Sequence, residues 1–301
     1  MNLKQFKYVL VLSQEGSFSA AADVLGISQP SLSQYIKKIE TEIGMPLFKR
    51  TGGNVRLTDA GEAYIDAGRR ILDIERQMQG RFDDLRENKT GTVKIGTSPF
   101  RSASAMPAIA KAFKEKYPGV CLEIHEHDTA SLMEGLLHGE FDVCLTMLPV
   151  DETLFEYEKI YDEEIVLAVP RAFEEFETSI AADRKYPVID FKDIQDKPFV
   201  FITETQFMQR IFDSLCAEHG VSVSPQVIVK SLESQISMVK EGIGMAVVSS
   251  EMQSFCSDDY VKYYSFKQKL PNREVVAVWR RDVDSTKTVR DLIDIIKNTL
   301  K

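Results

Sequence analysis

The feature that most constrains this chain is a tight turn between two helical segments close to its start. Small side chains in Ser19-Ala20-Ala21-Ala22 permit close helix packing, and Gly26 follows where a positive φ favours glycine. Ser28 can cap a further helix, and Pro30 falls in its first turn, where a missing amide donor costs nothing. The spacing predicts a helix from here to about Glu42 and a helix-turn-helix overall.

The helix after the turn has two different faces. Leu32, Ile36 and Ile39 form an apolar stripe, whereas Gln29, Ser33 and Lys37 recur every four residues on the other side. Amide and hydroxyl groups can bond base edges, and a lysine suits a phosphate or a guanine. The pattern favours a DNA-reading helix, although a plain three-helix bundle with a solvated polar face is the alternative. The candidate base contacts on and beside this face are Ser28, Gln29, Pro30, Ser33, Gln34 and Lys37.

Two further observations favour a DNA-binding role for this head. The segment 48–57 is typical of two short strands around Gly52-Gly53-Asn54, with Arg50 and Arg56 placed to hold the DNA backbone. Residues 1–58 carry a balance of +3 within a chain of net charge -9, so the remainder carries -12. A basic head on an acidic body can approach a polyanion head first. The sequence therefore predicts a winged helix-turn-helix over residues 1–58.

The segment after this head predicts a long helix, from Asp59 to about Asn88, without proline. Its apolar residues recur in a short heptad seam, which needs a partner surface because one helix cannot bury it alone. The alternative is that the helix lies on its own body. The candidate dimerisation residues are Tyr64, Ile71, Ile74, Met78 and Leu85, and residues 89–91 form the expected hinge.

From residue 92 onward, short β-rich runs alternate with amphipathic helices, which favours an α/β fold with parallel sheets. Ligands of such sheets bind beyond the carboxyl ends of strands, against helix N-termini. Ser98, Phe100 and Arg101 follow the first strand, and Ser98 with Arg101 could hold an anion. Alternatively, Ser98 only caps its helix and Arg101 points to solvent. Further candidates by position are Thr129, Thr146, Thr203, Thr205 and Ser231.

Several classes of protein fit less well. The chain has no GxSxG, Walker, HExxH or strand-linked GxGxxG motif, so we expect no enzyme and no cofactor. Four cysteines without CxxC spacing predict neither a disulfide nor a zinc site, and His125 and His127 fit a solvated strand edge better than a metal site. A redox sensor would need a close pair with an activated thiol. No leader or apolar span is evident, so we expect a cytoplasmic protein without a membrane partner.

The head resembles the LysR-type transcriptional regulators. The resemblance rests on Phe18-Ser19-Ala20-Ala21-Ala22, Leu25, Ser28-Gln29-Pro30-Ser31-Leu32-Ser33, Ile39-Glu40, Gly44, Pro46-Leu47-Phe48, Arg50 and Leu57-Thr58-Asp59-Ala60-Gly61. It implies base contacts from Gln29, Pro30 and Ser33, with Gln34 and Lys37 beside them, and a wing contact from Arg50. Position 34 is often basic in that family, and Gln34 departs from this pattern.

The resemblance also implies the organisation of the whole chain. A linker helix over 59–88 would form an antiparallel dimer contact, and residues 92–301 would form a two-lobed effector-binding domain like that of periplasmic solute-binding proteins. Lobe I would comprise 92–162 and 268–301, and lobe II would comprise 163–267. The implied partners are a palindromic double-stranded promoter site, a small-molecule effector, a second copy in a dimer or tetramer, and RNA polymerase. A solute receptor for transport would fit the body but not the basic head.

Overall fold

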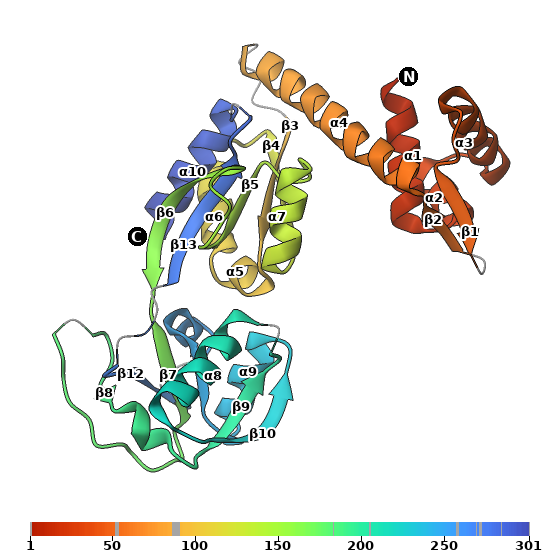
Figure 1. The fold of residues 1–301 in the computed structure, drawn as a ribbon. Coiled ribbons are helices and arrows are strands. Elements are labelled where there is room, and N and C mark those ends of the chain that lie inside the picture. Colours follow the sequence, from red (N-terminus) through yellow and green to blue (C-terminus); the bar gives the residue numbers. More distant parts are fainter. Residues whose placement is uncertain are drawn as a thin grey trace.

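The computed structural model describes residues 2–51, 54–85, 91–182, 184–204, 206–256, 259–268, 270, 273–283 and 285–300. A small head, a long helix and two α/β lobes follow one another along the chain (Figure 1). The expected hinge at 89–91 lies outside the described residues except for Gly91.

The head consists of three helices and a two-stranded wing: α1 (Leu3–Glu15), α2 (Phe18–Leu25), α3 (Gln29–Ile43), β1 (Phe48–Thr51) and β2 (Asn54–Leu57). Gly26 ends α2 with φ +65°, a left-handed conformation that favours glycine. The Ser28 side chain caps α3 by accepting from the Ser31 amide. Leu32, Ile36 and Ile39 bury the inner face of α3 in one core with α1. The predicted helix-turn-helix, its turn at Gly26 and its cap at Ser28 are confirmed, whereas the Ser17 side chain, which could have capped α2, makes no capping hydrogen bond.

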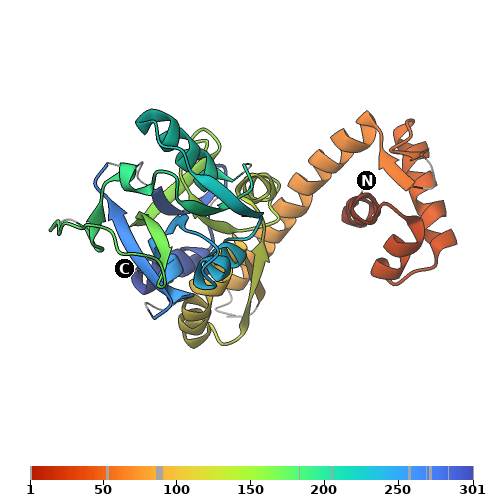
Figure 2. The same ribbon diagram turned by 90° about the horizontal axis from the view of Figure 1, so that it is seen from below.

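Helix α4 (Asp59–Leu85) begins inside this head. Thr58 caps it by accepting from the Gly61 amide, as the sequence indicates. Tyr64 is buried and stacks on Phe6 of α1, with ring centroids 5.0 Å apart. Gly68 also faces Phe6, and a Cβ built there would lie 2.5 Å from the Phe6 ring. The first three turns of α4 are therefore part of the head, and the rest of the helix extends away from it (Figure 2).

Lobe I contains a five-stranded sheet of order β4-β3-β5-β13-β6. Its strands are β3 (Gly91–Thr97), β4 (Val120–Glu126), β5 (Val143–Met147), β6 (Phe155–Glu163) and β13 (Arg273–Arg280). Its helices are α5 (Pro99–Ser104), α6 (Met106–Lys116), α7 (Thr129–Leu137) and α10 (Lys287–Thr299). Strands β3, β4 and β5 are parallel, but β13 runs antiparallel to both β5 and β6. The predicted parallel pairing is therefore confirmed for β3, β4 and β5, but the whole sheet is mixed, because the returning strand β13 lies antiparallel between β5 and β6.

Lobe II has two short sheets, of orders β11-β7-β12-β8 and β10-β9. Its strands are β7 (Ile165–Pro170), β8 (Val188–Ile189), β9 (Pro198–Ile202), β10 (Ser224–Val229), β11 (Ala246–Ser249) and β12 (Val261–Phe266). Its helices are α8 (Phe207–His219) and α9 (Leu232–Lys240), with 3-10 turns η1 (Phe191–Ile194) and η2 (Ser250–Ser254). Strand β7 pairs antiparallel with β11 and β12, and β12 pairs parallel with β8, so the four-stranded sheet is mixed, whereas β9 and β10 are parallel.

The two lobes are joined by β6 running into β7, with only Glu164 between them, and by the return to β13 (Figure 1). Each lobe has its own apolar core. No helix within the described ranges is long and apolar enough to cross a membrane.

Candidate functional site

The outer face of α3 presents the polar residues singled out in the sequence. The side chains of Ser28, Gln29, Pro30, Gln34 and Lys37 are exposed, and Ser33 is half-buried. Ser28 makes the cap to Ser31, so its hydroxyl has a structural role as well. The remaining groups face solvent on a rigid helix, which is how a recognition helix presents donors and acceptors to a major groove.

The wing is joined to this helix at its base, where Glu40 Oε1 accepts from the Leu47 and Phe48 amides. Strands β1 and β2 pair antiparallel with Lys49 opposite Arg56, and Arg56 is exposed. The Val55 amide donates to the Gly16 carbonyl, which ties the wing to the end of α1. Arg50 lies in β1, but its side chain is outside the described part of the structure.

Four of the candidate effector residues lie at the start of a helix or directly after a strand. In lobe I, the Ser98 side chain caps α5 by accepting from the Arg101 amide at 3.3 Å, and Thr129 is the first residue of α7. In lobe II, Thr203 follows β9 and Ser231 caps α9 by accepting from Ser234. Thr205 lies outside the described residues. Helix N-termini present free backbone amides, and they favour anions.

Three of the predicted effector residues are enclosed by protein. Phe100 packs against Phe255, and the Thr146 side chain is buried beside the last residue of β5. Arg101 is only 4% exposed, and its Nη2 lies 3.1 Å from Glu163 Oε1. The structure therefore places Arg101 neither toward solvent nor free to receive a ligand carboxylate by itself.

A second arginine shares the same carboxylate. Arg273, the first residue of β13, places Nη1 3.0 Å from Glu163 Oε2, and both side chains are at least nine-tenths buried. Its guanidinium also contacts the Met147 and Met208 sulfurs, and it lies 5.9 Å from the centre of the Phe207 ring. Met147 ends β5 of lobe I, whereas Phe207 and Met208 begin α8 of lobe II. Arg273 therefore lies between the lobes.

Sequence reasoning missed both Glu163 and Arg273. Residues 101, 163 and 273 are far apart in the chain, and only the meeting of the two inter-lobe connections brings them together. The available signal was a charged residue at each connection, Glu163 where β6 ends and Arg273 where β13 begins. Two guanidinium groups and one carboxylate leave an excess positive charge in a buried place, and the Nε atoms of both arginines have no hydrogen-bond partner.

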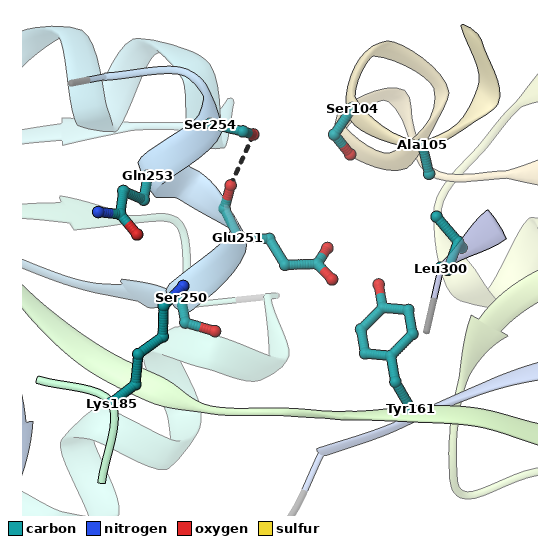
Figure 3. Close-up of a pocket in the computed structure, with 9 residues that line it drawn as sticks. All are labelled: Ser104, Ala105, Tyr161, Lys185, Ser250, Glu251, Gln253, Ser254 and Leu300. Carbon is teal, nitrogen blue, oxygen red and sulfur yellow. Dashed lines mark hydrogen bonds between the residues drawn. The ribbon is translucent and has the colours of Figure 1, made fainter. Parts of the chain in front are cut away.

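A pocket of about 430 Å³ lies between η2 and Tyr161 of β6 (Figure 3). The Tyr161 hydroxyl and the Glu251 carboxyl point toward each other across it. Burial raises the pKa of Glu251, and the nearby Glu163 raises it further, while Tyr161, Arg101 and Arg273 act in the opposite direction. Because its charged form is disfavoured, Glu251 only partly offsets the excess positive charge. The other residues that line the pocket are Ser104, Ala105, Lys185, Ser250, Gln253, Ser254 and Leu300.

The cysteines and histidines show no activated or metal-binding arrangement in the described part of the chain. All four cysteines are free. Burial raises the pKa of Cys216 to about 11 and raises the pKa values of Cys144 and Cys256 as well. A reactive thiol needs a pKa below its ordinary value, which is the opposite of what burial causes here. Among these residues no three His, Cys, Asp or Glu side chains gather as a metal site, and the rings of His125 and His127 lie 5.2 and 5.7 Å from that of Phe141.

The winged head, the linker helix and the two-lobed body define a DNA-binding regulator with an effector-binding domain. Residues 3–62 match the model of the bacterial regulatory helix-turn-helix protein, lysR family, and residues 86–301 match the LysR substrate binding domain. The chain belongs to the LysR family of transcriptional regulators, which are not enzymes.

Curated relatives share this organisation over their full length. The chain is 28% identical over 315 residues to the uncharacterized HTH-type transcriptional regulator YcgK of Bacillus subtilis, covering 100% of this chain and 95% of that protein. It is 29% identical over 300 residues to the HTH-type transcriptional regulator BudR of Raoultella terrigena, covering 98% and 100%.

Solved structures share the fold. A full-length OxyR variant from Pseudomonas aeruginosa has a TM-score of 0.73 at 24% identity, covering 100% of this chain and 94% of that chain. Full-length CbnR complexed with its target DNA has a TM-score of 0.67 at 17% identity, covering 99% and 100%.

Proposed function

We propose that this regulator is switched by a small anionic effector bound between lobes I and II. The observation that carries this proposal is the buried cluster of Arg101, Arg273 and Glu163, in which two guanidinium groups share one carboxylate. A buried charge without a full counter-charge is costly, so an anion close to the cluster would be stabilised. Ser98, Thr129, Thr203 and Ser231 stand at strand ends and helix starts of the two lobes, where free backbone amides would favour an anion.

The effector would act by favouring one arrangement of the lobes. A ligand shifts a conformational equilibrium only through a difference in affinity between the two states. Contacts from α5 and α7 in lobe I and from β9 and α9 in lobe II would all be satisfied only when the lobes close on the anion. Closure would bend the chain at Glu163 to Ile165 and near Arg273, where the charged cluster lies.

A thermal-shift experiment tests the charge of the effector. The purified full-length protein is mixed with a panel of small carboxylates, inorganic anions, neutral sugars and amines, and its melting temperature is measured. A ligand at a hundred times its dissociation constant adds about 2.7 kcal/mol to the stability. We expect stabilisation by at least one anion and by none of the neutral or cationic compounds. Stabilisation by a neutral or cationic compound alone would contradict the proposal.

A pair of arginine variants sharpens this test. Arg273→Met should abolish the response to the stabilising anion, because it removes the excess charge. Arg280→Met is the matched control, since Arg280 lies at the other end of the same strand and pairs with Asp282 at 2.8 Å. The control should keep the response.

On the DNA side, we infer that α3 reads base edges while Arg56, Arg50 and Lys37 contact the backbone of a palindromic site. Palindromic recognition needs two heads, and the open face of α4 offers a surface for a second copy. Ile71, Ile74, Met78 and Phe82 are exposed there, between 40% and 64%. Tyr64 is buried in the head, and the side chain of Leu85 lies outside the described residues. The dimer seam that we propose therefore centres on Ile71, Ile74 and Met78, with a second contact between bodies completing a tetramer.

A further inference from the structure

One contact joins the linker helix to the body of the same chain. Arg69 Nη1 of α4 lies 3.0 Å from His138 Nδ1, and its Nη2 lies 3.5 Å from Glu140 Oε1. Since an arginine only donates, His138 accepts through Nδ1 and carries its own proton on Nε2. The Arg69 side chain is 21% exposed, so the contact encloses most of it. His138 and Glu140 mark the C-terminal end of α7.

Arg69 lies on α4 directly after a residue that contacts the DNA-binding head. The preceding residue, Gly68, packs against Phe6 in the head, where a side chain would collide with the ring. Consecutive residues of α4 thus contact the DNA-binding head on one side and lobe I on the other. If the end of α7 moved against Arg69, the movement would act on a turn of α4 that is packed against α1.

The other end of α7 begins at Thr129, one of the residues of the proposed effector site. Asp128 caps the helix by accepting from the Ser131 amide, and Thr129 begins it. Leu132 and Leu136 are fully buried, and Gly135 lies against Phe141 so closely that a Cβ would be 2.5 Å from its ring. A nine-residue helix spans about 14 Å. The core side of α7 is therefore tightly packed along its length, and close packing of this kind transmits strain.

We propose that the C-terminal end of α7 is the docking surface of the linker helix of the same chain, and that α7 thereby connects the proposed effector site to the DNA-binding head. Charge favours this occupant: the carbonyl end of a helix and the Glu140 carboxylate are both negative, and Arg69 is positive. The segment from Leu85 to Gly91 also tethers α4 to β3, the strand that neighbours α7 in lobe I. The role of α7 in signalling depends on the proposed effector site, whereas the docking contact does not.

Hydrogen exchange of the full-length protein without any ligand tests the docking contact. We expect Arg69→Ala to speed amide exchange in residues 134–141 by about fivefold, the effect of losing roughly 1 kcal/mol. Arg70→Ala is the matched control, because Arg70 is the exposed neighbour on the same helix. It should leave that segment unchanged. Equal exchange in wild type and Arg69→Ala would overturn the proposal.

Swapping the charges of Arg69 and Glu140 shows whether the helix docked on α7 belongs to the same chain. Arg69→Glu should speed amide exchange in residues 134–141. The double variant Arg69→Glu with Glu140→Arg should return that exchange to the wild-type rate. Chains carrying only Arg69→Glu mixed with chains carrying only Glu140→Arg should show no restoration if the contact is within one chain. Restoration in the mixture would assign the surface to a second copy and contradict the proposal.

A last comparison tests transmission along α7. Removing its cap with Asp128→Ala should speed exchange in residues 64–72 of α4. Thr286→Ala, which removes the equivalent cap of α10, should not. No change in 64–72 with Asp128→Ala would overturn the connecting role of α7. Because no effector is used, these outcomes are independent of the thermal-shift test of the anion.

Discussion

Arg273 and Glu163 stand opposite each other on the two strands that connect the lobes, and their side chains form an ion pair with 3.0 Å between Nη1 and Oε2. Glu163 is the last residue of the outgoing strand β6, and Arg273 is the first of the returning strand β13. The pair therefore joins both connections at the point where the lobes would move. Arg101 adds a third charge from the helix that Ser98 caps.

Glu163→Gln should strongly destabilise the protein. It removes the carboxylate that the two buried guanidinium groups share, and breaking a buried pair in this way costs about 3–5 kcal/mol. Asp162→Asn is the matched control, because Asp162 makes an exposed pair with Lys159 and should contribute less than about 1 kcal/mol. Urea unfolding of the two variants measures the difference. Similar losses in both would show that the cluster is not what stabilises this region.

Glu251 should make the stability depend on pH. Its folded pKa is raised above the ordinary 4.5, so the folded protein holds this proton more tightly than the unfolded chain does. Stability from this group is therefore greatest in acid and falls as the pH rises from about 4.5 through the folded pKa. Glu251→Gln, which cannot titrate, should show a smaller fall over that range. Melting temperatures of both proteins from pH 4 to 8 measure this, and parallel curves would contradict it.

Features that depend on neighbouring residues could be predicted from the sequence, whereas features that depend on long-range contacts could not. The head follows from local signals, because Gly26, Ser28 and Pro30 act on their own neighbours. The charged cluster could not be predicted, since its members meet only through the two connections between the lobes. Arg101 illustrates the difference: its place after β3 was evident, but its burial against Glu163 depends on a residue 62 positions away. Tyr64 fits a heptad pattern equally well, yet tertiary packing against Phe6 places it in the head.

Ile74→Lys should weaken self-association. Ile74 is 64% exposed on α4, and a charge there would be buried when two linker helices pack together. The change should cost little in the isolated chain, because the residue is open. Sedimentation at micromolar concentration measures the oligomer, with Ile180→Lys as a control at a site that is 96% exposed in lobe II. A wild-type monomer, or an unchanged oligomer in Ile74→Lys, would contradict the proposed seam.

Gln29→Ala should relax DNA sequence preference. The exposed amide at the start of α3 can read a base edge, and its loss should cost roughly 1–3 kcal/mol on DNA selected by the wild-type protein. Binding to scrambled DNA should be unaffected, whereas Arg56→Ala should weaken both kinds of DNA and reduce the dependence on salt. Affinities on the two DNAs at several salt concentrations measure this. Equal losses on both DNAs for Gln29→Ala would place the reading residues elsewhere on the head.

The most direct test of an anion-operated switch is calorimetric titration of Ser98→Ala with the anion that stabilises the wild-type protein. The Ser98 hydroxyl caps α5, so its loss costs about 1 kcal/mol of stability, as in Thr286→Ala at the cap of α10. A hydrogen bond to a charged ligand is worth about 1.5–3 kcal/mol, or roughly ten- to a hundredfold in affinity. We predict that Ser98→Ala loses this affinity while keeping its DNA binding, and that Thr286→Ala loses neither. Equal anion affinity in Ser98→Ala and Thr286→Ala would contradict the proposed site.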